Sequence, residues 1–109
     1  MPDDTPRRVM PRREATVQLP PPYEMFSVTV WVNIPPAVWR DMMSNDLDKC
    51  AAAFGQIVVH HDLVDYDGAP YAAGGSPDLY RQLPTDLVRV INDVRAAQIG
   101  RLSPPSALI

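Results

Sequence analysis

The sequence has a single cysteine, Cys50, among its 109 residues. One thiol cannot form an internal disulfide framework or a cysteine metal cage, so neither is expected. The sequence also lacks an apolar run near the roughly 20 residues that span a bilayer, and no charged-then-apolar leader opens it. These absences predict a cytosolic protein in a reducing compartment, without membrane association.

Motifs of catalysis and nucleotide binding are also lacking, including Gly-x-Ser-x-Gly, Gly-x-Gly-x-x-Gly and phosphate-binding glycine loops. The adjacent His60 and His61 would point in different directions on a helix and to opposite faces on a strand, so they suit no shared metal ion. The aspartates before Gly68 lack the glutamate of a calcium loop, since Gly74 stands six residues later. The sequence therefore predicts a non-enzymatic protein with no catalytic residue, metal or cofactor.

An excess of positive charge is missing as well, because the net charge is −3. This balance argues against a nucleic-acid partner bound through phosphate neutralisation. Hydrophobic residues (46%) and charged residues (21%) are close to ordinary globular usage. A chain of this length is one small domain with a narrow stability margin, which favours a binding role over an enclosed catalytic pocket.

Proline, by contrast, is abundant, with 13 residues in clusters. Residues 1–24 combine proline with arginine and acidic residues and contain few large apolar ones, which predicts a flexible, disordered arm. An alternative reading makes Leu19-Pro20-Pro21-Pro22-Tyr23 a stiff polyproline contact for a partner. The two readings are compatible. Residues 25–100 are then the compact domain, and residues 101–109 a proline-containing tail.

The clearest strand covers about residues 26–34, where apolar residues alternate with polar ones from Phe26 to Ile34. Trp31 falls on the polar side of this alternation. It is expected to be covered by a helix or by the arm, or else to anchor a partner.

Helical patterns follow the strand. Pro36 opens a first helix that carries Trp39, Met42 and Met43, and Ser44 or Asn45 would cap the next one. That next stretch has apolar residues at helical spacing from Leu47 onward. The helix either ends near Gly55, with a strand after it, or continues to about His60; helix is the preferred reading.

A strong turn is predicted at residues 65–70, around Asp67-Gly68. Ser76-Pro77 then caps a short helix to about Gln82, and residues 83–86 begin the last helix, which Gly100 would close. Together these patterns predict a mainly helical α+β fold, with the single strand at about 26–34 packed on three to four helices behind a disordered arm.

The order of motifs in the C-terminal half resembles the small tail assembly chaperones of long-tailed bacteriophages. The resemblance covers about Leu47–Ile99, roughly half of the chain. It rests on the apolar run Ile57-Val58-Val59, the turn Asp65-Tyr66-Asp67-Gly68-Ala69-Pro70 and the start Leu83-Pro84-Thr85-Asp86-Leu87. His61 stands where those proteins often carry a tryptophan.

This resemblance implies a protein that coats the helical tape-measure protein during tail assembly in the host cytoplasm. It also implies contact with the major tail protein and self-association. Trp31, Trp39, Met42 and Met43 are the candidate partner-binding residues, since methionine and tryptophan suit an adaptable apolar surface; ordinary core packing is the alternative for the last three. The rival function is a structural virion component, such as a tail completion or connector protein, whose arm orders on assembly and whose strand extends a neighbour's sheet.

Overall fold

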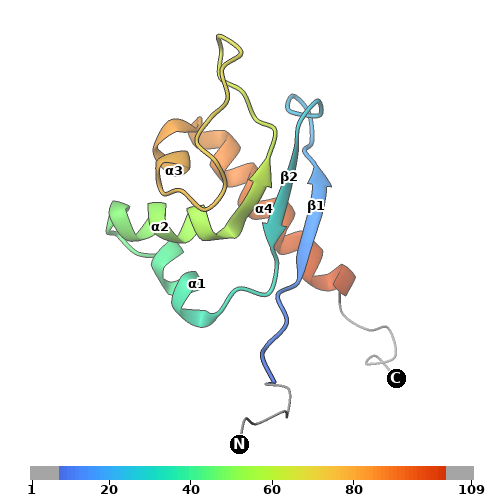
Figure 1. The fold of residues 1–109 in the computed structure, drawn as a ribbon, viewed down its shortest axis with the longest axis vertical. Coiled ribbons are helices and arrows are strands. Elements are labelled where there is room, and N and C mark those ends of the chain that lie inside the picture. Colours follow the sequence, from blue (N-terminus) through green and yellow to red (C-terminus); the bar gives the residue numbers. More distant parts are fainter. Residues whose placement is uncertain (1–7, 103–109) are drawn as a thin grey trace, which may run out of the picture.

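The computed structural model describes residues 8–102 and, for the side chains, residues 8–99. Within that part of the chain a three-stranded sheet is combined with four helices (Figure 1). The elements are β1 (Glu14–Gln18), β2 (Ser27–Trp31), α1 (Pro36–Met42), α2 (Leu47–Ile57), β3 (Val58–His61), α3 (Asp78–Gln82) and α4 (Thr85–Leu102).

The sheet is antiparallel, in the order β1-β2-β3. Ala15 of β1 pairs with Val30 of β2, and Val17 pairs with Val28. Because successive side chains of a strand point to opposite faces, these four residues form one apolar face. The hydroxyl groups of Thr16 and the opposite Thr29 lie 2.7 Å apart on the other face.

The pairing of β2 with β3 contains a bulge. His60 is opposite Thr29, whereas Val58 is opposite Val30, so Val59 is an extra residue on β3. His61 is opposite Val28 and therefore lies on the other face of the sheet from His60. Of the two alternatives given for these histidines, helix or strand, the structure has the strand.

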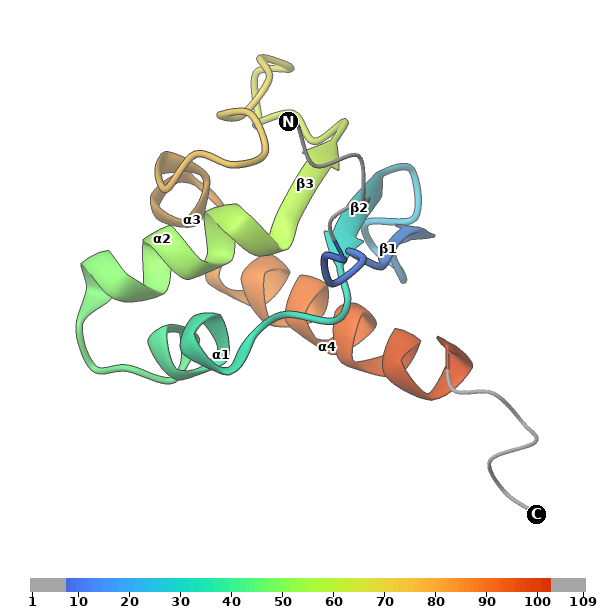
Figure 2. The same ribbon diagram turned by 60° about the horizontal axis from the view of Figure 1, so that its bottom comes forward.

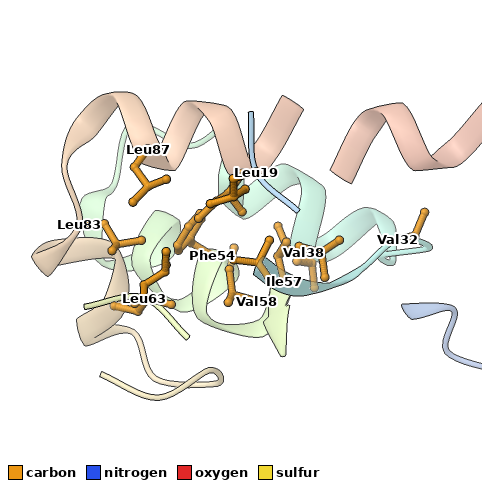
Figure 3. Close-up of a cluster of buried hydrophobic side chains, with 14 residues drawn as sticks. Leu19, Val32, Val38, Phe54, Ile57, Val58, Leu63, Leu83 and Leu87 are labelled. Atoms are coloured by element: carbon orange, nitrogen blue, oxygen red, sulfur yellow. The ribbon is translucent and has the colours of Figure 1, made fainter. Parts of the chain in front are cut away.

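The helices cover the apolar face of the sheet. In Figure 1, α4 passes behind β1 and β2, and Figure 2 shows it running beneath the strands with α1 and α2 to one side. Leu87 and Ile91 of α4 are buried in one cluster with Val28 and Val30. Figure 3 shows this cluster. Its largest fully buried members are Phe54, Ile57, Leu63, Leu79, Ile91, Val28, Val30 and Val58.

The prediction of a single strand behind a disordered arm is wrong. Residues 14–18 form β1, and Leu19, which follows, is buried in the same cluster as Phe54 and Leu87 (Figure 3). The prolines that follow form the connection to β2, which contains a cis peptide bond between Pro21 and Pro22. An alternation of apolar and polar residues in β1 matches that of β2, so pairing buries both apolar faces. Residues 1–7 of the predicted arm lie outside the described residues.

The prediction that α2 continues as helix to about His60 is also wrong, because the chain changes from helix to strand at Val58. Gly55 does not end the helix. A Cβ atom on Gly55 would lie 2.7 Å from the backbone oxygen of Ser76, so glycine lets the 74–76 loop pack against α2. Asp46, and neither Ser44 nor Asn45, caps α2 by accepting hydrogen bonds from the Asp48 and Lys49 amides.

The predicted turn and C-terminal helices are present. The Asp65 side chain accepts hydrogen bonds from the amides of Asp67 and Ala69, and Gly68 has a φ of 84°. The helices α3 and α4 begin at Asp78 and Thr85, close to their predicted starts. Gly100 does not close α4, which continues to Leu102, and residues 103–109 of the predicted tail lie outside the described residues.

Candidate binding groove between α1 and α4

An open groove with a volume of about 600 Å³ lies between α1 and the second half of α4. Its lining includes Val32 and Ile34 after β2, Trp39 of α1, and Arg95, Ala96 and Ile99 of α4. We refer to it as the α1–α4 groove. No acidic side chain of the described residues lines it.

The lengths of the elements explain why the groove is open. Helix α4 has 18 residues and is therefore about 27 Å long, and Figure 2 shows it crossing beneath the strands and running past β1. The second half of α4 thus extends beyond the sheet. Pro35 and Pro36 end the extended segment after β2 and begin α1, whose seven residues are too few to cover that half completely.

Arg95 is the unusual residue of this groove. It follows Leu87 and Ile91 at steps of four residues, so it continues the core-facing stripe of α4, and only 4% of its surface is exposed. Its Nη1 donates a hydrogen bond to the Val32 carbonyl oxygen over 3.2 Å, whereas its buried Nε has no acceptor. Burial lowers the pKa of the Arg95 guanidinium, but arginine stays charged at neutral pH.

Trp39 forms the opposite wall of the groove. The Arg95 guanidinium carbon lies 5.7 Å from the centroid of the Trp39 ring, within the range of a cation–π interaction. Trp39 is nevertheless 49% exposed. Met43, four residues later, is 68% exposed, and residues at this spacing share one side of a helix. The exposed apolar surface therefore continues from the groove along α1.

The segment before β1 is fastened beside the groove by Asn33. Its Oδ1 accepts hydrogen bonds from the Arg13 amide at 2.7 Å and from Trp31 Nε1 at 3.0 Å. Its Nδ2 donates to the Pro11 carbonyl oxygen at 2.8 Å. One side chain thus holds part of the predicted arm in place at the groove margin.

The four predicted partner-binding residues do not form one surface. Trp39 lines the groove and Met43 is exposed near it, but Met42 is half-buried against the core. Trp31 lines a different hollow, where the Arg12 guanidinium carbon lies 4.1 Å from its ring centroid. Of the two predicted covers for Trp31, a helix or the arm, the arm is the one that packs on a face of its ring.

Arg95 and Asn33 are the groove residues that sequence reasoning missed. A sequence signal for Arg95 existed, because the spacing of Leu87, Ile91 and Arg95 places a charge on the apolar stripe of a helix. Asn33 had no comparable signal, since its hydrogen bonds join segments about 20 residues apart in the chain.

A second hollow, of about 410 Å³, lies between the β1–β2 connection and the 64–71 loop. Tyr23, Tyr66 and Tyr71 line it. The Tyr23 hydroxyl donates a hydrogen bond to Asp86 Oδ2 over 2.7 Å, and this bond is the main cause that raises the pKa of Tyr23 to about 12. Desolvation raises the pKa of Tyr71. Tyr23, predicted as part of a contact for a partner, thus ties its own loop to the start of α4.

The remaining candidates for chemistry have structural partners. The Leu63 amide donates to His61 Nδ1 over 3.0 Å, so His61 Nε2, at 2.6 Å from the Ala72 carbonyl oxygen, is the protonated nitrogen. The Cys50 thiol is buried and lies 3.1 Å from the Ser44 carbonyl oxygen. Among the described residues no three His, Cys, Asp or Glu side chains gather in a way that could hold a metal ion.

Comparison with protein families, with curated proteins and with solved structures finds no match to this chain. In the part of the chain that the structure describes, no helix has the length and apolar character needed to cross a membrane.

Proposed function

We propose that the chain is a small, non-enzymatic binding protein that shields an apolar helical segment of a larger partner. The observation that supports this most is the α1–α4 groove, where Trp39 and Ile99 are about half exposed and Met43 continues the apolar surface. Contiguous exposed apolar surface on a small domain is typical of a protein-interaction site. An amphipathic helix laid into an apolar groove is a common way to cover such a surface.

From the resemblance to tail assembly chaperones, we propose that this partner is the tape-measure protein of a long-tailed bacteriophage. In this proposal the chain acts in the host cytoplasm, coats the tape-measure helix before the tail tube forms, and also contacts the major tail protein and further copies of itself. Trp39 and Met43 would contact the tape-measure helix. Met42 would support α1 from below, since it packs against the core.

Co-expression tests this proposal. A tagged copy of the chain is produced together with the long helical protein encoded next to it, and the soluble fraction of that protein is measured with and without the chain. We expect the long protein to become soluble and to co-purify. If it stays insoluble and nothing co-purifies, the proposal is wrong.

Two variants test whether the long helical protein binds at the α1–α4 groove. Trp39→Ala and Met43→Gln should reduce co-purification by about tenfold or more, since buried tryptophans contribute strongly to interfaces. Tyr66→Ser is the matched control, because Tyr66 is 92% exposed in the distant 64–70 loop. Equal co-purification of all three variants would place the contact elsewhere.

A structural virion component is the second candidate, and the outer edge of β1 is the observation that favours it. Among the described residues β1 pairs with β2 alone, which leaves its other edge for a strand from a neighbour. Strand β2 cannot serve in this way, because it is the central strand. Mass spectrometry of purified particles separates the two candidates: a virion component is present in the particle, and a chaperone is not.

A further inference from the structure

The buried charge of Arg95 has no compensating carboxylate among the described side chains. Arg12 lies near Glu14, and Arg81 lies near Asp48 and Asp78, so these two arginines have acidic partners. Within residues 8–99, Arg95 instead has one hydrogen bond, to the Val32 carbonyl oxygen, and the nearby ring of Trp39. An arginine has five N–H donors, so most of its capacity is unused here.

A buried guanidinium without a carboxylate partner lowers the stability of the folded chain. Removing a cation from water costs several kcal/mol unless it is paired, and an apolar residue of similar length commonly fits a buried site equally well or better. The apolar stripe of Leu87 and Ile91 would continue with an apolar residue at position 95. A ligand that carries the missing negative charge would account for the arginine.

The lining of the groove narrows the chemistry of this ligand. Val32, Ile34, Pro36, Trp39, Ala96 and Ile99 provide apolar contacts around the buried Arg95, and the polar residues Arg13 and Asn33 complete the lining. A phosphate group has more oxygens to satisfy than a carboxylate, and most of this lining is apolar. One carboxylate flanked by apolar side chains fits both the charge and the walls.

We propose that the α1–α4 groove binds an apolar segment of a protein partner that carries one aspartate or glutamate, and that this carboxylate pairs with Arg95. The inference rests on the proposed function for the statement that the ligand is a protein segment. It adds the chemistry that selects one segment of a long helical partner over another. Apolar side chains provide area, and the carboxylate fixes the register, because charge-assisted hydrogen bonds are strong and directional.

A panel of capped peptides tests the inference with the full-length chain. Each peptide has about 15 residues, with a leucine stripe on one helical face. A single glutamate moves through the central turns from one peptide to the next, and each peptide has a twin with glutamine in its place. Titration followed by tryptophan fluorescence gives the affinity. The Nε–Hε signal of Arg95 in ¹H–¹⁵N spectra reports pairing at the guanidinium.

We expect at least one glutamate peptide to bind about tenfold more tightly than its glutamine twin and to shift the Arg95 signal. The preference should disappear in Arg95→Met. It should persist in Arg89→Met, the matched control on the exposed face of the same helix. The comparison of twins needs no altered protein, so it holds even if Arg95→Met folds poorly.

Several results would overturn the inference. Equal affinity of all twins would show apolar docking without carboxylate recognition, and a preference that survives in Arg95→Met would assign recognition to another residue. Inorganic phosphate that shifts the Arg95 signal as strongly as the peptides would indicate a phosphate ligand. Absence of binding by every peptide to a folded chain would exclude the groove as a site for apolar helices.

The inference and the proposed function can fail separately. In one outcome, the glutamate peptide binds more tightly than its glutamine twin while the long helical protein stays insoluble on co-expression. That result would support carboxylate recognition by Arg95 and contradict the tape-measure function. If co-expression makes the long helical protein soluble and the twin peptides bind with equal affinity, the shielding function is supported and the proposed role of Arg95 is wrong.

Discussion

The two halves of α4 share one helical stripe but lie in different surroundings. In the first half, Leu87 and Ile91 are buried in the hydrophobic core, in one cluster with Val28, Val30 and Phe54. In the second half the stripe continues with Arg95, which lines an open groove together with Ile99. The first half is therefore expected to stabilise the fold, and the second half to serve a partner. The difference shows how one regular helix can separate stability from binding along its length.

The largest expected effect comes from the first half. Ile91→Ala should lower the free energy of unfolding by about 3 kcal/mol, because Ile91 is fully buried and its loss leaves a cavity. Urea denaturation followed by circular dichroism measures this change. Arg89→Ala, on the exposed face, should stay within about 0.5 kcal/mol of the parent chain. A loss below about 1 kcal/mol for Ile91→Ala would mean that this half is not the anchor of the fold.

A smaller effect is expected where the β1–β2 connection meets the start of α4. Tyr23→Phe removes the hydrogen bond from the Tyr23 hydroxyl to Asp86 and should cost about 1 kcal/mol at neutral pH. The same denaturation measurement applies. Tyr66→Phe is the control, because Tyr66 is exposed and its hydroxyl should contribute little.

The same hydrogen bond predicts a pH dependence. The hydrogen bond that the Tyr23 hydroxyl donates to Asp86 is the main cause that raises the pKa of Tyr23 from 10.0 to about 12 in the folded chain. Between these values the unfolded chain releases the phenolic proton and the folded chain keeps it, so unfolding is increasingly favoured as pH rises. The stabilising contribution is thus complete below about pH 10 and lost toward pH 12. Parent and Tyr23→Phe should differ less in stability at the top of this range, and a constant difference would contradict the assignment.

The smallest expected effect sharpens the contrast between the halves. Arg95→Met should change the free energy of unfolding by less than about 1 kcal/mol, because the lost bond to Val32 is offset by removal of a poorly compensated buried charge. Denaturation of the variant beside Ile91→Ala gives the comparison directly. A loss of more than about 2 kcal/mol would make Arg95 part of the stabilising half.

Local patterns predicted the elements that depend on local signals. The alternation around Val28 and Val30 located β2, and Pro36, Ser76 and Pro84 located helix starts to within a few residues. These residues act through their own backbone preferences or their immediate neighbours, so the sequence alone carries the information.

Strands β1 and β3 depend on a distant partner, and for that reason β1 was missed and the strand at β3 was only the second alternative. Ala15 and Val17 alternate with polar residues, but the nearby arginines and prolines made the segment resemble a disordered arm. Pairing with β2 supplies the apolar face that this segment cannot form alone. The periodicity of residues 58–61 fits either a helix or a strand. They form a strand because they pair with β2.

The candidate site was predictable only in part. Trp39 was identified as an apolar residue available to partners, and it lines the groove. Trp31, with the same side chain, is held against Arg12 and Asn33 in another place, which only the folded arrangement shows. Arg95 was not singled out in the sequence, although it continues the apolar stripe of its helix and is buried within it.

The position of β1 also sets the limits of the smallest chain that can fold by itself. A shortened chain that begins at residue 25 would lose β1 and the buried Leu19, and with them one wall of the core. Val28 and Val30 would then border an unsatisfied strand edge that invites pairing between molecules. We therefore expect a chain that begins at residue 13 to elute from a size-exclusion column as the parent chain does, and a chain that begins at residue 25 to aggregate.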